Sequence, residues 1–355
     1  MRLWQVNSET LTNSALGQNA ALLLSLCIPT YQRAGFLEEG LDAALVQWAD
    51  DLTPLQRRQV EVIICDNAST DGTPALVKKV QEANPSLALT YFRQPENRGA
   101  DANILQAASL GTGQYLYLLS DDDILLPGAL RAMLALIDSH PGMAAFCLNS
   151  RPFLKSPAEE TVPVLPLNPD QPIESLEDCL YFLGTRLTFL SILLFRRDAF
   201  AAGEYSRFVG SNLLQSYVFV DALGRGGMFV PQRIFLATRE NNTGGYNFFQ
   251  VFVTGFGDVM RYARSQGCAE TTIRAVLARH LAQFLLPFVA AFELHGVHGG
   301  LQPDFKDGAR RLLAEYGLSP VLIFCLLPLL LAPAHAVHGL RTGIRLVRGR
   351  SKGAA

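Results

Sequence analysis

Three polar clusters in the sequence could do chemistry, and each follows an apolar run that is typical of a buried strand. They are the segments PTYQR at 29–33, DNASTDGT at 66–73 and SDDD at 120–123. Three adjacent carboxylates repel one another, and a bound cation relieves that repulsion. Mg²⁺ and Mn²⁺ prefer such oxygen ligands and commonly complete their coordination with a substrate phosphate. The third cluster therefore predicts a metal site; the alternative is a solvated turn.

The elements that must position these clusters alternate between strand and helix. Strand patterns occupy 21–31, 60–66, 87–93, 114–120 and 143–149, and helix patterns occupy 36–49, 73–83, 100–110 and 128–139. Such repeated strand–helix–strand units specify an α/β domain with a mostly parallel sheet. Because the loops at the carboxyl ends of parallel strands form the ligand crevice, we expect the three clusters to meet there.

The second half of the chain has a less regular pattern. A long loop is predicted over 151–172, followed by helices near 174–183 and 211–223 and strands near 190–196 and 228–236, with mainly helical sequence after Asn242. The six cysteines include no CxxC pair, and three of them lie in strand-like apolar runs. That pattern predicts buried free thiols rather than disulfides or metal ligands.

Four segments in order, CIPTYQR, DNASTDGT, ENRGADANILQAA and LLSDDDILLPGAL, together resemble family 2 glycosyltransferases of the GT-A fold. The resemblance is strong over 22–149 and weak up to about Asn242. It implies a Rossmann-like α/β domain. It also implies transfer of a sugar from a nucleotide-sugar donor to an acceptor hydroxyl, with Mg²⁺ or Mn²⁺ as cofactor.

The resemblance also implies the residues that bind the donor. They are Pro29, Thr30, Tyr31, Asp66, Asn97, Arg98, Gly99 and Asn103, with the acidic triplet at the metal and pyrophosphate. Arg33 could pair with phosphate or be a solvated residue at a helix start. Asp66 could equally form an Asx turn, and Gly99 could serve loop closure alone.

The acidic triplet departs from the common family pattern, which is Asp-x-Asp-Asp followed three residues later by proline. Counting back from Pro127 places Ser120 at the first Asp, with Asp122 and Asp123 as the later pair and the predicted metal ligands. In the alternative register, Asp121 and Asp123 form the Asp-x-Asp. The sequence leaves both registers open, and Asp121 is counted among the predicted donor-binding residues.

The acceptor side departs from the family as well. Many inverting members carry a Glu-Asp pair before a helix, and its Asp removes the acceptor proton. Counting from Gly226-Gly227 puts Leu214-Gln215 at that place, and an amide cannot act as a base at neutral pH. Asp221, six residues on, is the predicted base beside Gln215; the other candidates are Glu204 and Glu240.

Composition and charge exclude several classes of protein. Hydrophobic residues make up 49% of the 355 residues and charged residues 17%, which excludes a disordered chain, a collagen-like repeat and a disulfide-rich miniprotein. The formal charge of −2 argues against a nucleic-acid partner. No Asp or Glu follows Glu315, whereas Arg341, Arg345, Arg348, Arg350 and Lys352 do. An acidic body with a basic tail points to an anionic membrane surface.

The tail completes the predicted domain organisation: an N-terminal tail at 1–20, a GT-A domain at 21–240, a helical extension at 241–316 and a membrane-associating tail at 317–355. The apolar stretch 321–334 is too short to span a bilayer as a helix, so an interfacial anchor is favoured over a core helix or a true span. The N-terminus lacks a signal-peptide pattern. We therefore expect a peripheral or monotopic protein on the cytoplasmic side of the bacterial inner membrane, with a glycan or polyprenyl-linked glycan as acceptor.

Three rival functions remain to be compared. A dehydrogenase is disfavoured because no GxGxxG follows the first strand, and a nucleotidyltransferase because no Gly-rich basic phosphate loop occurs early in the chain. A catalytically inactive membrane scaffold or sugar-nucleotide-binding protein of the same fold is the non-enzyme alternative, motivated by the missing Glu-Asp pair.

Overall fold

The computed structural model describes residues 21–166, 170–239, 246–295 and 305–317. Its centre is an eight-stranded sheet with the order β3-β2-β1-β4-β9-β6-β10-β8. The strands are β1 (Leu24–Thr30), β2 (Val60–Asp66), β3 (Ala88–Arg93), β4 (Tyr115–Leu118), β6 (Ala145–Cys147), β8 (Gln171–Ile173), β9 (Leu193–Arg196) and β10 (Met228–Val230). β1 to β4 pair in parallel, whereas β9 runs antiparallel to both β4 and β6. The mostly parallel sheet is confirmed.

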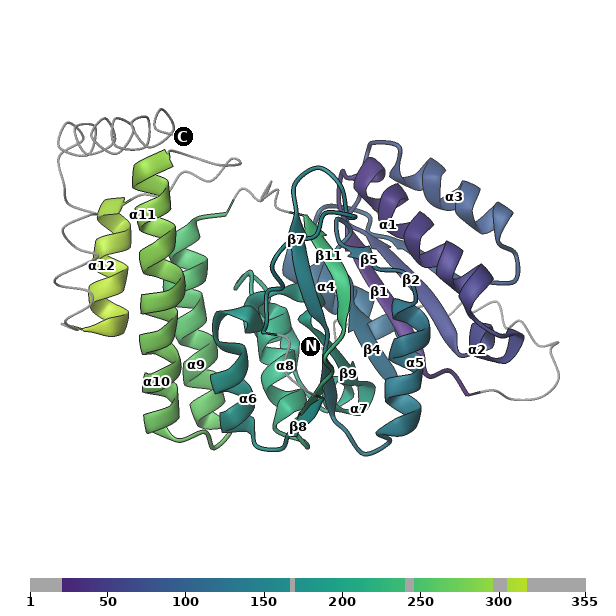
Figure 1. The fold of residues 1–355 in the computed structure, drawn as a ribbon. Helices are drawn as coiled ribbons and strands as arrows, with labels where there is room; N and C mark the ends of the chain where they lie inside the picture. Colours follow the sequence, from purple (N-terminus) through teal and green to yellow (C-terminus); the bar gives the residue numbers. More distant parts are fainter. Residues whose placement is uncertain (1–20, 167–169, 240–245, 296–304, 318–355) are drawn as a thin grey trace, which may run out of the picture.

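Helices cover both faces of this sheet because the side chains of its strands alternate between two cores. On one face, α1 (Ala34–Val46), α3 (Thr73–Ala83) and α5 (Ala129–Ser139) pack against alternate residues of β1 and β2, such as Leu26 and Val62. On the other face, α4 (Ala100–Leu110) and α8 (Leu214–Leu223) pack against Cys27 and Ile63. Figure 1 shows α1 and α3 together on the side of the sheet where β1 and β2 lie.

A second, smaller sheet lies beside the carboxyl end of β4. Its order is β5-β11-β7, with β5 (Ile124–Leu125), β7 (Asn149–Phe153) and β11 (Ile234–Arg239). This sheet explains two differences from the predicted pattern, because the single strands expected at 143–149 and 228–236 are each divided between the two sheets. β7 also extends into the predicted 151–172 loop.

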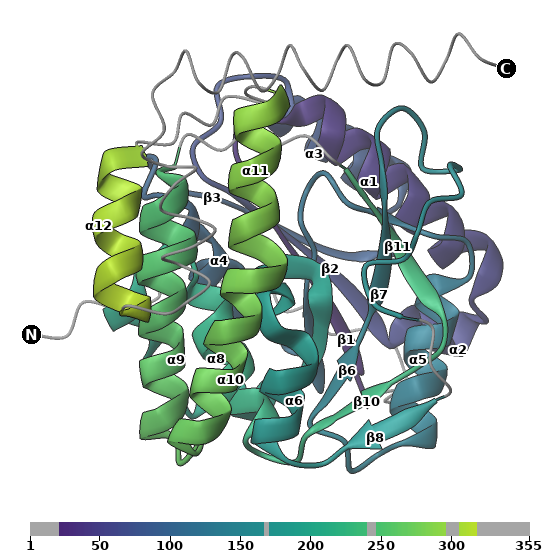
Figure 2. The same cartoon turned by 60° about the vertical axis from the view of Figure 1, so that its left-hand side comes forward.

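The remaining helices form a separate layer, which Figures 1 and 2 show standing at one side of the sheet. It contains α6 (Leu176–Leu183), α9 (Phe256–Ser265), α10 (Glu270–His280), α11 (Leu286–His295) and α12 (Phe305–Tyr316). Aromatic side chains hold part of it together: Phe248 stacks on Phe288 with ring centroids 3.7 Å apart. Short elements complete the fold: α2 (Pro54–Arg58), α7 (Arg197–Ala201), and helical turns at 47–51, 184–188, 190–192, 205–208, 250–255 and 281–285.

The predictions about the cysteines and about membrane association can be compared with the described residues. The five described cysteines, Cys27, Cys65, Cys147, Cys179 and Cys268, are free and buried, as expected. By length and composition, one helix in the described residues, Glu270–Ala290, could cross a membrane, although a third of its most apolar window is buried within the protein. The predicted tail segment at 317–355 lies, apart from its first residue, outside the described residues, as does Glu240.

Candidate active site

The first two polar clusters are tied together by Gln32, which follows β1. Its side-chain oxygen accepts hydrogen bonds from the backbone N–H groups of Thr70 and Asp71, and its own N–H donates to Ser69 Oγ at 2.9 Å. Gln32 has a φ of 55°, in the left-handed region that non-glycine residues seldom adopt. Such a strained conformation persists only where surrounding contacts hold it. Here the hydrogen bonds of Gln32 hold it, and they join the loop after β1 to the loop after β2.

The acidic triplet lies at the carboxyl end of β4 and is joined to the first cluster. Thr30 Oγ1 donates to Asp121 Oδ2 at 2.7 Å, and Arg33 Nη1 lies 3.0 Å from Asp121 Oδ1 and 3.3 Å from Asp122 Oδ2. Asp123 Oδ2 accepts from Ser191 Oγ at 2.7 Å. The predicted meeting of the strand ends is therefore observed for the first and third clusters, through a direct ion pair.

Two carboxyl groups of the triplet are hard to ionise in their surroundings. Burial raises the pKa of Asp123 to about 7, and the neighbouring Asp122 carboxylate adds to this effect. Burial also raises the pKa of Asp121 to about 6, although Arg33 opposes the shift. Both carboxylates are thus costly to ionise in this place, and a further cation would stabilise the charged forms.

These residues fit a divalent cation of the Mg²⁺ or Mn²⁺ type. Within the described residues, no group of three His, Cys, Asp or Glu side chains is arranged to hold a metal. A cation of this type needs one or two carboxylates when substrate phosphates supply further oxygens. Asp121 is 5% exposed and engaged by Thr30 and Arg33, whereas the side chain of Asp122 is 16% exposed. Asp122 is thus the carboxylate of the triplet most open to a ligand.

Asp66, at the end of β2, is fully buried and has hydrogen bonds to both oxygens. Oδ1 accepts from the Ser69 N–H at 2.8 Å, and Oδ2 accepts from the Tyr91 hydroxyl at 2.6 Å. The Ser69 bond stabilises the turn after β2, so the structural alternative for Asp66 has direct support. The same carboxylate lies 3.6 Å from Arg93 Nε. Its predicted contact with a nucleotide stays a prediction.

The segment before α4, which contains Asn97, Arg98 and Gly99, is hydrogen-bonded to Asn67 of the second cluster. Asn67 Nδ2 donates to Asn97 Oδ1 at 2.8 Å, and the Arg98 N–H donates to Asn67 Oδ1 at 2.8 Å. Gly99 has a φ of 85°, a conformation that favours glycine and that turns the chain into α4. Asn97, Arg98 and Gly99 are exposed. They are therefore available to a ligand at the strand ends.

Asn103, in the first turn of α4, has one polar side-chain atom unsatisfied. Its Nδ2 donates to the carbonyl oxygens of Cys65 at 2.7 Å and Thr30 at 3.3 Å, thereby bridging β2 and β1. Its Oδ1 is buried and has no protein partner among the described residues. At the end of β1, Pro29 is half-buried and the Tyr31 side chain is 41% exposed. A ligand donor near Asn103 would remove a buried unsatisfied acceptor.

The two acceptor-side candidates lie on α8 in different surroundings. Gln215 is buried, and its Nε2 donates to the Thr188 carbonyl at 2.7 Å, while its Oε1 has no described protein partner. Thr188 precedes Ser191, the partner of Asp123, so Gln215 supports the segment next to the triplet. Asp221 instead accepts hydrogen bonds from Tyr205 at 2.8 Å and Tyr262 at 2.7 Å. No described contact joins Asp221 to the triplet, and its role as base stays a prediction.

Sequence reasoning missed two residues that organise the site. Ser191 precedes the antiparallel strand β9, and its hydroxyl donates to Asp123 while accepting from the Ser120 N–H at 2.9 Å. Asp101, at the start of α4, is 3% exposed and accepts from backbone N–H groups of Gly210, Asn212 and Leu214. An acidic residue in the first turn of a helix is a weak local signal, and no local pattern marks Ser191.

Comparison with protein families matches residues 25–200, just under half of the chain, to glycosyl transferase family 2. Among curated relatives, abequosyltransferase RfbV of Salmonella typhimurium is 36% identical over 118 residues, 33% of each chain. GalNAc(5)-diNAcBac-PP-undecaprenol beta-1,3-glucosyltransferase of Campylobacter jejuni is 28% identical over 111 residues, 31% of this chain and 33% of the relative. The chain thus spans about a third of the length of these relatives.

Solved structures extend the likeness over most of the chain. S. aureus TarS 1–349 gives a TM-score of 0.59 at 18% identity and covers 90% of this chain and 92% of that one. The mannosyltransferase PcManGT from Pyrobaculum calidifontis, solved with GDP-Man and Mn²⁺, gives 0.50 at 18% identity over 91% of this chain and 80% of that one. At this identity the likeness shows the fold, which is of the GT-A type.

Proposed function

From the membership of residues 25–200 in glycosyl transferase family 2, we propose that this chain transfers a sugar from a nucleoside-diphosphate sugar to a hydroxyl of a glycan or lipid-linked glycan. One observation carries the proposal. Three carboxylates lie at the end of β4, and Arg33 is bound to two of them, all within the family-matched residues. Nothing in the structure favours the inactive alternative.

For the donor, we propose the residues around the strand ends. The Pro29–Tyr31 segment and Asp66 would hold the base and ribose, and Asn97, Arg98 and Gly99 are exposed beside them. The unsatisfied Oδ1 of Asn103 supports a hydrogen-bond donor of the nucleotide as its partner. Arg33 would bind the pyrophosphate, because a guanidinium already beside Asp121 can bridge to phosphate oxygens.

For the metal, we propose Asp122 and Asp123 as ligands, with Asp121 held inward by Thr30 and Arg33. A divalent cation bound there supplies Lewis-acid stabilisation of the leaving nucleoside diphosphate. The chain's own contribution is to hold the carboxylates: Ser191 fixes Asp123, and Ser120 Oγ donates to Asp122 Oδ1 at 2.6 Å. Such fixed charges need no reorganisation as charge develops.

For the acceptor, we propose that Gln215 orients the hydroxyl through its unsatisfied Oε1 and that Asp221 takes the proton. Asp221→Asn tests the second role against a structural one. A base predicts a fall of about 100-fold or more in kcat with little change in the KM for acceptor. A residue that merely anchors Tyr205 and Tyr262 predicts a lower unfolding temperature with kcat nearly retained.

The cellular place is proposed from the sequence of the tail. Its apolar and basic segments at 317–355 support binding to an anionic membrane surface on the cytoplasmic side of the bacterial inner membrane. Flotation with anionic liposomes at low and high salt tests this for full-length protein and for protein truncated before Gly317. Full-length protein that never floats contradicts the proposal.

The transferase activity itself is tested by donor hydrolysis and by transfer. Purified full-length protein is incubated with UDP-, GDP- and dTDP-sugars and Mn²⁺, and release of the nucleoside diphosphate is measured. We expect release with one nucleotide class and its loss in EDTA. Absence of binding and of release with every donor contradicts the proposed function and supports a scaffold.

A further inference from the structure

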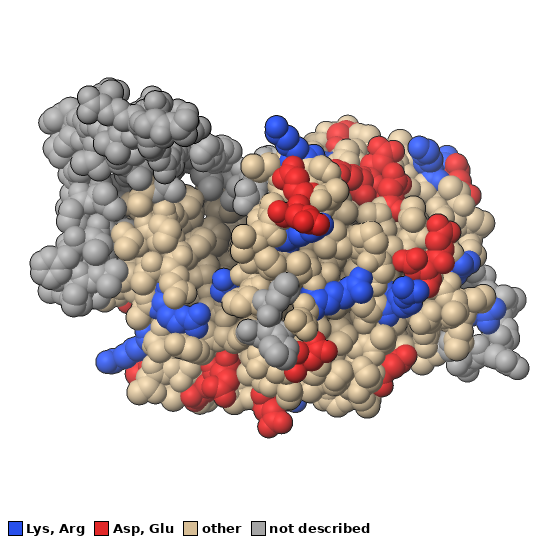
Figure 3. Space-filling view, in the orientation of Figure 1, with Lys and Arg blue, Asp and Glu red and all other residues tan. Residues whose placement is uncertain are grey.

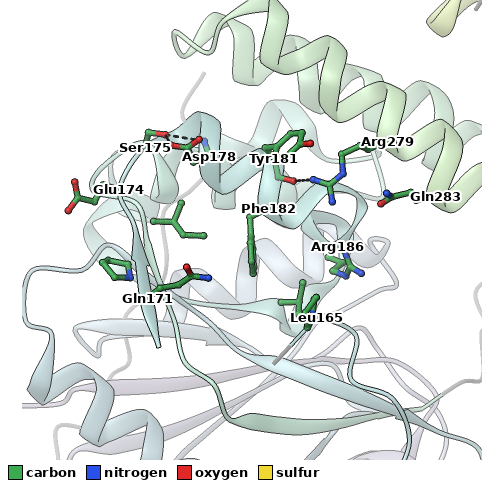
Figure 4. A pocket seen from close by; sticks show the side chains of 13 residues that line it. Leu165, Gln171, Glu174, Ser175, Asp178, Tyr181, Phe182, Arg186, Arg279 and Gln283 are labelled. Carbon is green, nitrogen blue, oxygen red and sulfur yellow. Dashed lines mark hydrogen bonds between the residues drawn. The ribbon is translucent and has the colours of Figure 1, made fainter. Parts of the chain in front are cut away.

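A cavity of about 860 Å³ lies outside the donor crevice, between α6, the β8 end of the sheet and α10. Figure 4 shows that its two ends differ in charge. Glu174, Ser175 and Asp178 lie at one end, and Asp178 is occupied by a hydrogen bond from Ser175 at 2.7 Å. Arg186 and Arg279 lie at the other end, with Gln283 beside them.

The two arginines have backbone partners but no acidic ones. Arg186 Nε donates to the Val164 carbonyl at 2.9 Å, and Arg279 donates to the Tyr181 carbonyl and lies over the Tyr181 ring, 4.4 Å from its centroid. Within the described part of the chain, neither guanidinium forms an ion pair. Both are partly exposed to the cavity.

The arginines are also close enough to act on each other. Burial lowers the pKa of Arg186, and the charge of Arg279 lowers it further. Two like charges facing one cavity are unfavourable without a counter-ion, and planar guanidinium groups match phosphate oxygens. A smaller cavity of about 200 Å³ shares both arginines and continues to Phe189 and Phe284. Its aromatic lining gives the basic end an apolar neighbour.

The segment that carries Arg186 also leads to the donor crevice. Arg186 belongs to the 3-10 helix at 184–188, and five residues later Ser191 donates to Asp123. Five residues of chain span at most about 18 Å, so Arg186 lies within that distance of Ser191, while the cavity lining includes no residue of the triplet. That spacing suits an acceptor whose charged group is separate from its reacting hydroxyl.

Apolar surface adjoins the basic end on the α10 side. The helix continues from Arg279 and Gln283 through Phe284, Leu286 and Phe288, which are half-buried. Figure 3 shows uncharged surface over the α11 part of this helix, with Lys and Arg side chains lower down over α10. A diphosphate bound by the arginines could therefore carry an apolar chain along the helix without burying a further charge.

We propose that Arg186 and Arg279 bind the phosphate or diphosphate group of the glycan acceptor, an assignment that rests on the proposed transferase function. The site is separate from the nucleotide crevice, because it uses no residue of the strand-end clusters. The ligand class is thus a phosphorylated acceptor, in which the anion anchors one end and the sugar hydroxyl reaches the triplet.

The test measures the binding of inorganic pyrophosphate and geranyl diphosphate to the full chain by calorimetry, in EDTA so that no metal bridges the anion to the triplet. We expect R186Q and R279Q each to weaken binding about tenfold, since each removes charge-assisted hydrogen bonds. The matched control is R274Q, because Arg274 lies on the same helix, is exposed and pairs with Glu270 outside the cavity. R33Q controls for binding at the donor crevice.

Equal affinity in R186Q, R279Q and R274Q overturns the proposal, as does loss of binding in R33Q alone. Geranyl diphosphate that binds more tightly than pyrophosphate supports a lipid-linked acceptor, and equal affinities support recognition of the diphosphate alone. A third outcome would also overturn the assignment: the protein floats with phosphatidylglycerol vesicles only when both arginines are present, yet it binds no pyrophosphate. The ligand would then be a bilayer headgroup. If R186Q lowers the unfolding temperature strongly, R279Q carries the test.

The outcomes also separate this inference from the proposed function. If pyrophosphate binding depends on both arginines but the protein releases no nucleoside diphosphate from any donor, the anion site is supported and the transferase function is contradicted. If the protein turns over a donor but its two arginines bind no anion, the transferase function is supported and the anion site is overturned.

Discussion

The acidic triplet and the arginine-lined cavity are two regions with opposite imbalances of charge. The triplet has three carboxylates and is paired with Arg33, whereas Arg186 and Arg279 have no acidic partner in the described residues. The segment 184–191 connects them, because it carries Arg186 at one end and Ser191, the partner of Asp123, at the other. Each region is incomplete by itself, and each imbalance specifies the sign of the ligand that would complete it.

The largest expected effect comes from the acidic side of this comparison. Asp122→Asn and Asp123→Asn should each lower the rate of sugar transfer by about 1,000-fold, because each removes a proposed ligand of the cation that stabilises the leaving group. Asp138→Asn is the matched control, since Asp138 is exposed on α5. The measurement is transfer with saturating donor and Mn²⁺. Full activity of either variant, or activity unaltered in EDTA, contradicts the metal assignment.

A second prediction contrasts the triplet with a buried acid that needs no cation. Asp101 is satisfied by backbone N–H groups of the segment that begins α8. Asp101→Ala should lower the free energy of unfolding by about 3 kcal/mol, because it leaves those donors unpaired. Chemical denaturation measures the change. The affinity for Mn²⁺ should stay within twofold of the wild type once the protein is folded; a large change would link Asp101 to the metal site.

The two regions also differ in how well sequence predicts them. The triplet and the segments around Thr30 and Asn103 are predictable because each follows a strand of a local, repeated βαβ pattern, and the parallel pairing of β1, β2 and β4 then brings them together. Asp66 shows the limit of that reasoning: its position at a strand end is predicted, but its hydrogen bond to Tyr91 depends on the neighbouring strand.

The arginine pair is not predictable in the same way. Arg186 lies in a 3-10 turn and Arg279 on a helix far along the chain, so their proximity depends on tertiary packing alone. The antiparallel insertion of β9 between β4 and β6 sets the position of the 184–191 segment. Strand periodicity carries no information about which neighbour a strand will choose, and hence none about this contact.

A third prediction tests the basic side in the working enzyme. R186Q and R279Q should each raise the KM for a phosphorylated acceptor about tenfold, because each removes an interaction made before the chemical step. The KM for the donor should change by less than twofold. Steady-state kinetics with both substrates varied measures this split. A rise in the donor KM of equal size would place the arginines at the nucleotide and remove the contrast between the two regions.

The smallest expected effect concerns His280, which follows Arg279 directly yet adds no charge to the basic side. Its Nε2 donates to the Phe252 carbonyl at 2.6 Å and its Nδ1 lies 2.7 Å from the Thr185 hydroxyl. Burial lowers the pKa of His280 to about 4, so the imidazole stays neutral in the fold.

The sign of the pH effect follows from this depressed pKa. The unfolded chain protonates His280 near its ordinary pKa of about 6.5, whereas the folded chain does so near 4. As the pH falls through this window the unfolded state binds more protons, so His280 should remove roughly 1 kcal/mol of stability between pH 7 and pH 5.5. His280→Gln retains one donor and one acceptor and should lose this slope. Denaturation at several pH values compares the two proteins, and identical slopes would mean that His280 binds protons equally in the folded and unfolded chains, which contradicts the lowered pKa.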